Sequence, residues 1–308
     1  MLSRRIFVTT ALGAGAVLAT QDHKAAAQAD RRMIVDAQIH LWKAESEDWR
    51  WVPGLQPQLP EPFTIERAIS MMDEAGVDRA VIVPPSWPGD RNDYALEAVK
   101  RHPTRFRVMG RIPLQDPKSA DRLPTWKEQQ GMLGVRVIFN NPRTIPWLTD
   151  GTADWFWPAA EKAGLPVMCF APGRTAAFGQ IAQKHPQLTL IIDHMGVNMA
   201  MADDGRLEGA IGETVALAKY TNVSVKLSAS PGISREPYPF RDVTVHLKRV
   251  FDAYGPQRSY WGTDLTNSFA KASYRQRITQ FTQELSFLSE SNKDWVMGRA
   301  IVERLKWT

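Results

Sequence analysis

Three polar residues, Asp36, Gln38 and His40, end an apolar segment that begins at Met33. Residues two apart on a strand point to the same side, so we expect these three side chains to share one face. An acid, an amide and an imidazole can move protons and form hydrogen bonds, and they are costly to bury without partners. A lone histidine at such a place usually makes a structural hydrogen bond, so the rest of the chain must decide between the two interpretations.

Two other apolar segments also end in residues that can do proton chemistry. His194 directly follows the segment 188–193, and Asp264 directly follows the segment 259–263. If all three segments are parallel strands of one barrel, their carboxyl ends meet at one face and His40, His194 and Asp264 converge. We therefore predict that these three residues are catalytic. Other polar residues stand at expected strand ends, namely Ser86, Arg111, Asn140, Asn141, Arg174 and Ser228.

Two positive charges, Arg136 and Lys226, interrupt segments that are otherwise apolar. A charge in such a place is rarely buried without a partner. Either these side chains pair with carboxylates such as Asp36 or Asp264, or they hold an anionic ligand. Both interpretations stay open at this point.

The elements that must position these residues alternate regularly along the chain. Each apolar segment is followed by a helical pattern, such as the one that Thr64 caps and Gly76 ends. Such alternation predicts a parallel sheet with crossover helices, and eight units favour a closed (β/α)₈ TIM barrel in a single domain, 30–308. An open doubly wound sheet is the alternative, but its glycine-rich first turn is not found at 38–42. The expected strands are 33–40, 79–84, 106–112, 133–139, 165–171, 188–193, 222–227 and 259–263, and the expected helices include 64–75, 92–102, 121–130, 154–163, 175–185 and 207–220.

The first 29 residues are typical of a twin-arginine signal peptide. Arg4 and Arg5 precede an apolar segment, 8–19, and Ala27-Gln28-Ala29 is the expected cleavage site. The apolar segment is shorter than the roughly 20 residues that a membrane-spanning helix needs, so a permanent anchor is disfavoured. We predict export to the periplasm. Cys169 is the only cysteine, so no internal disulfide is expected.

The charge of the chain is mildly basic, with a formal net charge of +5. The chain contains no block of consecutive Lys and Arg residues, which disfavours nucleic-acid binding. After signal cleavage, no membrane partner is expected. A small anionic substrate is compatible with this charge. The tryptophans within 42–51 and 147–157 could line a pocket or an interface, so a homo-oligomer remains open.

Five short motifs, in their order and spacing, give the chain a family resemblance. It resembles the amidohydrolase superfamily, in the branch named amidohydrolase family 2, which includes metal-dependent TIM-barrel hydrolases, lactonases and some decarboxylases. The motifs are Asp36-x-Gln38-x-His40-Leu41-Trp42, Leu165-Pro166-Val167-Met168, Ile192-Asp193-His194-Met195-Gly196, Val225-Lys226-Leu227-Ser228 and Trp261-Gly262-Thr263-Asp264.

The resemblance implies a metal set that this chain keeps only in part. The usual ligands are a His-x-His pair on the first strand, histidines on the fifth and sixth strands, and an aspartate on the eighth. His40, His194 and Asp264 match, whereas Gln38 and Phe170 replace the two other histidines. The resemblance therefore points to lactonases that work without metal, and no cofactor is expected. The alternative is one divalent metal such as zinc on the three remaining ligands.

The function expected from these observations is hydrolysis of an anionic lactone or related cyclic ester. Asp264 would act as the general base for water, while His40 and His194, with Gln38, would donate hydrogen bonds to the carbonyl oxygen. Two rivals remain: a metal-dependent hydrolase or decarboxylase, and a non-catalytic periplasmic protein that binds small carboxylates.

The remaining site residues are expected to bind the substrate or support the histidines. Arg136 and Lys226 would bind a substrate carboxylate. Asp36 would orient His40 from beneath. Three aromatic side chains would exclude water and pack against the ring, namely Trp42, Trp87 and Phe170.

Overall fold

The computed structural model describes residues 31–307. The predicted signal peptide and its cleavage site lie outside the described residues, so they and the export that they imply stay predictions. No helix in the described part of the chain is both long enough and apolar enough to span a membrane. From Met33 onward the chain forms one compact unit.

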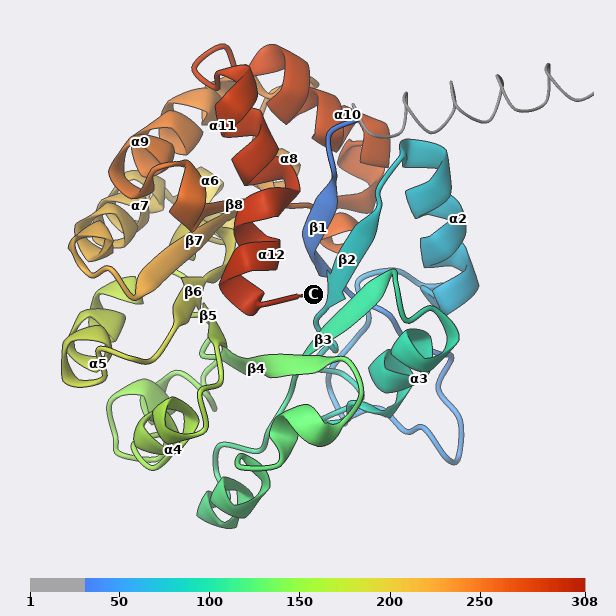
Figure 1. Cartoon of the computed structure of the whole chain (residues 1–308), viewed down its shortest axis with the longest axis vertical. Helices are drawn as coiled ribbons and strands as arrows, with labels where there is room; N and C mark the ends of the chain where they lie inside the picture. Colours follow the sequence, from blue (N-terminus) through green and yellow to red (C-terminus); the bar gives the residue numbers. More distant parts are fainter. Residues whose placement is uncertain (1–30, 308) are drawn as a thin grey trace, which may run out of the picture. The chain divides into compact units, whose positions relative to one another are not determined.

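Eight parallel strands follow one another around a barrel, each hydrogen-bonded to the next in the sequence (Figure 1). The last strand returns to the first, where the Asp264 N–H donates to the Gln38 carbonyl oxygen at 3.1 Å. The predicted (β/α)₈ barrel is confirmed. The strands are β1 (Val35–Ile39), β2 (Arg79–Ile82), β3 (Phe106–Gly110), β4 (Met132–Ile138), β5 (Val167–Phe170), β6 (Leu190–Ile192), β7 (Val223–Ser228) and β8 (Ser259–Gly262).

The helices lie outside the barrel and begin and end where the sequence signals them in most cases. At α2 the Thr64 side chain accepts from the Arg67 N–H at 3.2 Å, and Gly76 ends the helix with a φ of 79°. The helices are α2 (Ile65–Ala75), α3 (Asp93–Arg101), α4 (Phe156–Lys162), α5 (Phe178–Lys184), α6 (Ala200–Asp204), α7 (Leu207–Ala216), α8 (Ser230–Ile233), α9 (Thr244–Tyr254), α10 (Tyr274–Thr279), α11 (Glu290–Asp294) and α12 (Ala300–Leu305).

One predicted helix, 121–130, is wrong. The segment instead contributes to two short 3₁₀ turns, Pro117–Arg122 and Trp126–Glu128. Pro124 stands between them, and proline lacks the N–H that a continuous α-helix would use there. Trp126 nevertheless anchors this connection, because its ring is buried and its indole N–H donates to the Gly134 carbonyl oxygen at 2.9 Å.

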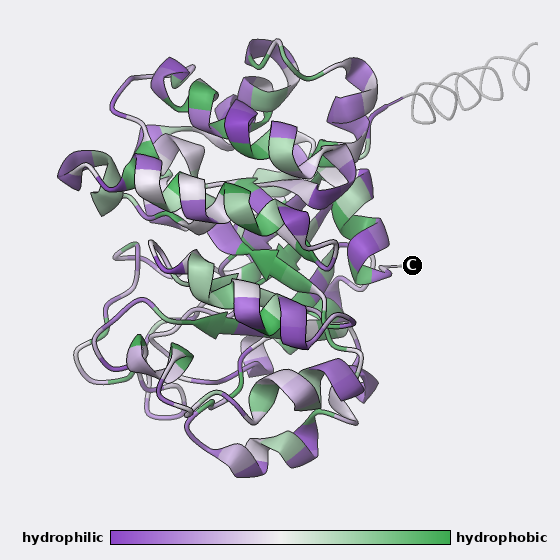
Figure 2. Ribbon diagram, turned by 90° about the vertical axis from the view of Figure 1, so that its left-hand side faces the viewer, coloured by the Kyte–Doolittle hydropathy of each residue, from purple (hydrophilic) through white to green (hydrophobic). Residues whose placement is uncertain are grey.

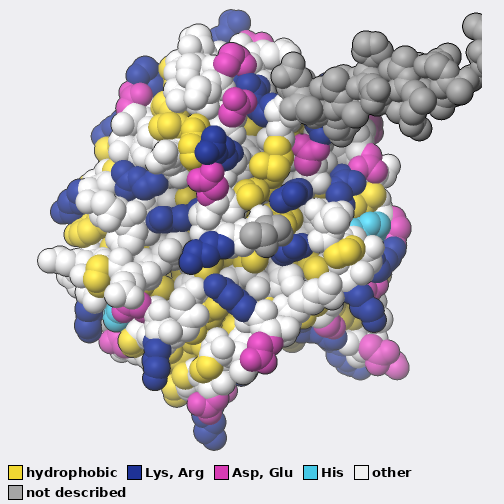
Figure 3. Space-filling view, in the orientation of Figure 1, with side chains coloured by type: hydrophobic (Ala, Val, Ile, Leu, Met, Phe, Trp, Pro, Cys, Tyr) yellow, Lys and Arg dark blue, Asp and Glu magenta, His cyan; other side chains and the backbone are white. Residues whose placement is uncertain are grey.

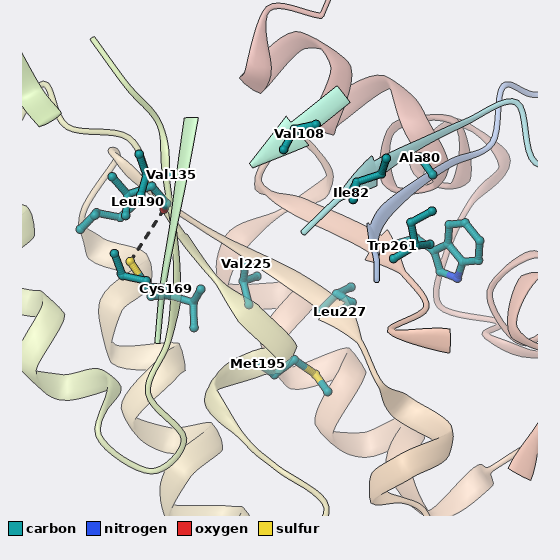
Figure 4. Close-up of a cluster of buried hydrophobic side chains, with 14 of the residues drawn as sticks. Ala80, Ile82, Val108, Val135, Cys169, Leu190, Met195, Val225, Leu227 and Trp261 are labelled. Carbon is teal, nitrogen blue, oxygen red and sulfur yellow. Dashed lines mark hydrogen bonds between the residues drawn. The ribbon is translucent and has the colours of Figure 1, made fainter. Parts of the chain in front are cut away.

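Apolar side chains pack on both surfaces of the barrel wall. Those between the strands and the helices form the larger cluster, part of which Figure 4 shows, with side chains from β2 to β8. Figure 2 shows the same division, with hydrophobic strands inside and hydrophilic helix surfaces outside. Full burial of one such aliphatic or aromatic side chain contributes about 1.5–3 kcal/mol. The rigid wall that results fixes the directions of the inward side chains.

The barrel interior has an apolar layer at the end where the strands begin. Its members include Val35, Val81, Met168 and Tyr260, and helix α12 packs against it. Arg79 and Arg107, at the starts of β2 and β3, lie over the Trp307 ring at 5.5 and 5.2 Å. Figure 3 shows Lys and Arg side chains gathered around this C-terminal segment. The apolar layer closes this end, so the inward polar residues lie toward the carboxyl ends of the strands.

Candidate active site

The first strand does not keep the regular alternation that the sequence suggests. Its register with β2 shifts between Asp36 and Ile39, as at a β-bulge. Beyond the shift Gln38 contacts His40 and His194. Asp36 contacts β8 and α10 instead. The expectation that all three polar residues share one face is therefore wrong, because the irregularity turns Asp36 away from the other two.

Asp36 ties the closing strands of the barrel together. Its Oδ1 accepts the backbone N–H groups of Gln38 at 3.0 Å and Thr263 at 2.8 Å, and its Oδ2 accepts the hydroxyls of Thr263 at 2.5 Å and Tyr274 at 2.7 Å. Burial raises the pKa of Asp36, although all four hydrogen bonds oppose that shift. The predicted role of Asp36 in orienting His40 is thus wrong. The Val83 carbonyl oxygen, 2.6 Å from Nδ1, holds that ring instead.

His40 and Asp264 form a close, buried pair. The Nε2 atom of His40 lies 2.9 Å from Asp264 Oδ1, and both side chains are almost fully buried. Burial alone would raise the pKa of Asp264, but His194, His40 and Arg136 outweigh it and hold that pKa well below its usual range. Gln38 Nε2 lies 3.4 Å from the same His40 nitrogen, so the Gln38 amide and the Asp264 carboxylate both face it.

Lys226 fixes the amide of Gln38 and, through it, the protonation of His194. Lys226 Nζ donates to Gln38 Oε1 at 2.7 Å, so the Gln38 amide nitrogen points at His194 Nε2, 3.1 Å away. That ring nitrogen must accept, which places the proton on Nδ1, 2.7 Å from Ser228 Oγ. Burial lowers the pKa of His194 to about 4, in agreement with a neutral ring.

This tautomer bears on the role expected for His194. Donation from Nε2 to a carbonyl oxygen would need the proton on the other nitrogen, where Gln38 already donates. Of the three predicted donors, Gln38 places its amide nitrogen between the two rings, 3.1 Å from His194 Nε2 and 3.4 Å from His40 Nε2.

The backbone is strained where two of these residues leave their strands. His194 follows β6 with a φ of 53°, and Asp264 follows β8 with a φ of 47°. Non-glycine residues rarely adopt this left-handed region, and such conformations cluster at functional sites. At the β6 turn, the Thr214 hydroxyl donates to the Met195 carbonyl oxygen at 2.9 Å, which helps to hold the turn. Both catalytic candidates are therefore placed by specific turns.

The two buried cations share a carboxylate that the sequence analysis did not assign. Lys226 Nζ lies 2.8 Å from Asp193 Oδ1, and Arg136 Nε lies 3.1 Å from Asp193 Oδ2. The expected pairing with Asp36 or Asp264 is therefore replaced by pairing with Asp193. Lys226 has no exposed surface and two partners, which makes it a support for Gln38. Arg136 contacts Asp193 through Nε, and the residue also lines a neighbouring cavity.

The three predicted aromatic residues do not lie in one place. The Phe170 ring meets His194 edge-on at 5.2 Å, and the Arg136 guanidinium lies 5.3 Å from its centre, so Phe170 belongs to the site. Trp42 and Trp87 are buried and meet edge to face at 5.0 Å. Neither lines the cavity that contains Arg136, and Trp42 also packs against the Phe63 ring at 5.8 Å.

Two supporting residues were not assigned from the sequence, although both carry a signal in the motifs. Asp193 directly precedes His194. Ser228 follows Lys226 by two positions, so on a strand the Ser228 and Lys226 side chains point to the same side. Their roles depend on distances across strands that lie far apart in the sequence. The sequence shows that a polar residue stands at a strand end, but it does not show which side chain that residue contacts.

The comparisons with known proteins identify the family. The model of the family described as Amidohydrolase matches residues 35–301. The chain belongs to the amidohydrolase family. A 4-sulfomuconolactone hydrolase of Hydrogenophaga intermedia is 30% identical over 68% of this chain and 67% of its own length, and an L-fucono-1,5-lactonase of Burkholderia ambifaria is 24% identical over 75% and 79%.

A solved structure shows the shared amidohydrolase fold. An amidohydrolase from Burkholderia multivorans with bound zinc superposes with a TM-score of 0.75 at 18% identity, covering 89% of this chain and 99% of the other. Its zinc belongs to that protein. Whether the residues of this chain suit a metal has to be judged from their own arrangement.

The site of this amidohydrolase does not fit the family metal. Its donor positions include Gln38, whose amide N–H group lies 3.1 Å from His194 Nε2 and 3.4 Å from His40 Nε2, the two nitrogens that would have to face an ion. Lys226 fixes that orientation from behind. Among the described residues, no group of three or more His, Cys, Asp or Glu side chains is arranged to hold a metal ion.

Proposed function

We propose that this protein is a lactone hydrolase that uses Asp264 as the general base. The observation that carries the proposal is the buried Asp264 carboxylate, whose Oδ1 lies 2.9 Å from His40 Nε2. The neighbouring side chains hold the pKa of Asp264 well below its usual range, so it stays ionised in a nearly dry site and can take a proton from water. The lactone-hydrolysing relatives, a 4-sulfomuconolactone hydrolase and an L-fucono-1,5-lactonase, support this reaction class.

The reaction adds one water across the ring ester. Asp264 takes a proton from water as the water oxygen bonds to the carbonyl carbon, and negative charge moves onto the carbonyl oxygen. The Gln38 amide and the His40 ring donate hydrogen bonds to that oxygen. The ring carbon–oxygen bond then breaks, and the proton that Asp264 took from water passes to the leaving ring oxygen, which restores the Asp264 carboxylate. The product is an open-chain hydroxy acid.

The substrate is anionic in this proposal, because the space beside the catalytic group is lined by arginine. Arg136 is buried, is held at Nε by Asp193, and lines the cavity. A planar guanidinium binds a carboxylate through two parallel hydrogen bonds. Phe170 stacks beneath it and fixes its plane.

The test is hydrolysis of a panel of lactones, with and without acidic substituents, by the purified protein. Asp264→Asn should lower kcat by about 10²–10⁴-fold on the best substrate. Asp121→Asn, which changes an exposed aspartate, is the matched control and should keep wild-type kcat. Wild-type kcat in Asp264→Asn would show that the base is wrongly assigned, and no turnover of any lactone would overturn the proposed function.

We propose further that hydrolysis needs no metal ion, which the place and orientation of Gln38 support. Elemental analysis of protein purified without chelator decides this. Stoichiometric zinc that is lost in His194→Ala would favour the metal-dependent alternative. Tight binding of small carboxylates without any turnover would favour the non-catalytic binder.

Export to the periplasm is a proposal that rests on the sequence of residues 1–29 alone. Replacement of both Arg4 and Arg5 by lysine should leave the precursor in the cytoplasmic fraction of a bacterial host. An unchanged periplasmic yield would contradict a twin-arginine signal.

A further inference from the structure

A cavity of about 590 Å³ lies at the ends of β2, β3 and β4 and shares Arg136 with the candidate site. Ser86, Arg111, Asn141 and Arg143 line it, and Arg136 joins it to the catalytic residues through Asp193. Its size falls within the roughly 300–1,000 Å³ range of small-molecule sites. The cavity is therefore large enough for substituents of a ring held at the catalytic group.

Arg111 has a hydrogen-bonding group in this cavity that the protein does not use. Its Nε and Nη2 contact Asp90 Oδ1 at 3.2 and 3.1 Å. Its Nη1 is buried and has no acceptor among the described residues. A buried donor without a partner costs free energy, so its persistence in a pocket is a reason to look for a ligand.

The strand end that carries Arg111 is held in place before any ligand arrives. The Asn92 side chain accepts the Arg111 N–H at 2.7 Å and donates to the Arg111 carbonyl oxygen at 3.0 Å. Asp90 fixes the guanidinium plane from one side. Because the group is preorganised, little conformational entropy is lost when Nη1 gains an acceptor.

The charges around the cavity favour an anion with more than one acidic group. Burial lowers the pKa of Arg111, Asp90 opposes that shift, and the nearby Arg136 adds to it. Among the described residues that line the cavity, Asp90 is the only acid, against the three arginines 111, 136 and 143. Two neighbouring buried guanidinium groups repel each other until an anion lies between them.

We propose that Arg111 binds a second acidic group of the substrate, so that the preferred lactone carries two acidic substituents, carboxylate or sulfonate. This inference rests on the proposed function and extends it to the class of substrate. Arg136 takes the acidic group nearer the catalytic residues, and Arg111 Nη1 takes the one farther away. Arg111 thereby becomes a residue that determines specificity.

The test compares two lactones that differ by one acidic group, muconolactone and 4-sulfomuconolactone. Arg111→Met should lower kcat/KM for 4-sulfomuconolactone by about 10–100-fold and change the value for muconolactone by less than threefold. Arg241→Met, which changes an exposed arginine outside this cavity, is the control for general positive charge and should change neither value by more than threefold. Equal losses on both lactones in Arg111→Met would overturn the proposal.

A binding measurement separates this inference from the proposed function. Titration calorimetry with glutarate and its monoamide needs no turnover. Wild-type protein should bind glutarate at least tenfold more tightly than the monoamide, and Arg111→Met should abolish that preference while Arg241→Met keeps it. If no lactone is hydrolysed but this pattern holds, the lactonase assignment fails and the anion site stands. If lactones are hydrolysed and no preference exists, only the site fails. An unchanged melting temperature confirms that Arg111→Met is folded.

Discussion

Lys226 is the buried charge on which both the fold and the catalytic group depend, so Lys226→Met is an informative perturbation. Its ammonium lies 2.8 Å from Asp193 Oδ1 and 2.7 Å from Gln38 Oε1, and none of its side chain is exposed. Methionine fills a similar volume but carries no charge and no donor. Asp193 would keep only Arg136, and the Gln38 amide would lose the contact that orients it.

The expected cost follows from the charges that remain. Two unit charges 2.8 Å apart attract by about 6 kcal/mol at an effective dielectric constant of about 20, and desolvation of the pair offsets part of this. Removal of one partner of a buried pair costs about 3–5 kcal/mol, because the other charge stays buried. Since Arg136 still reaches Asp193, we expect a loss of about 3–4 kcal/mol, or about 6–16 °C in Tm.

Urea unfolding measures this loss. The control is Lys184→Met, which changes an exposed lysine on α5 and should leave the free energy of unfolding within about 0.5 kcal/mol of wild type. A double-mutant cycle with Asp193→Asn should show that the double variant loses less than the sum of the single losses. In the enzyme assay kcat should fall with little change in KM, because Gln38 no longer holds its orientation. A loss below about 1 kcal/mol, or additive single losses, would refute the reasoning.

Three further outcomes follow from the described contacts. Asp36→Ala leaves two buried N–H groups without an acceptor and should destabilise the fold by about 3–6 kcal/mol in urea unfolding, and a loss below about 1 kcal/mol would contradict its role in closing the barrel. Because the pKa of His194 is about 4 in the folded state, below its ordinary 6.5, unfolded protein binds more protons between these values. Stability is then fully present above about pH 6.5 and falls by about 3 kcal/mol toward pH 4, and His194→Gln should show a shallower fall. Because the pKa of Asp264 is lowered, this base stays ionised, and its protonation should cause no decline of kcat/KM between pH 6 and pH 5. A decline in this range that shifts to higher pH in Asp264→Glu would contradict an ionised Asp264.

The barrel and the convergence of His40, His194 and Asp264 could be predicted from the sequence because both follow from local patterns. Each strand is a short apolar run, and caps such as Thr64 and Gly76 mark where helices begin and end. Parallel strands of a barrel end at one face, so His40, His194 and Asp264 had to converge once the fold was known. The helix predicted at 121–130 failed because 3₁₀ turns satisfy the same composition when a proline interrupts it.

The connections within the site were decided by the tertiary structure. The irregular register of β1 separated Asp36 from Gln38 and His40, although regular alternation would have joined them. Asp193, on another strand, lies within hydrogen-bond reach of both Arg136 and Lys226, and Lys226 then set the Gln38 amide and the tautomer of His194. Such pairings depend on distances of a few ångströms between residues far apart in the chain. Sequence alone determines which groups can meet at the mouth of the barrel, and packing determines which atom of each faces which.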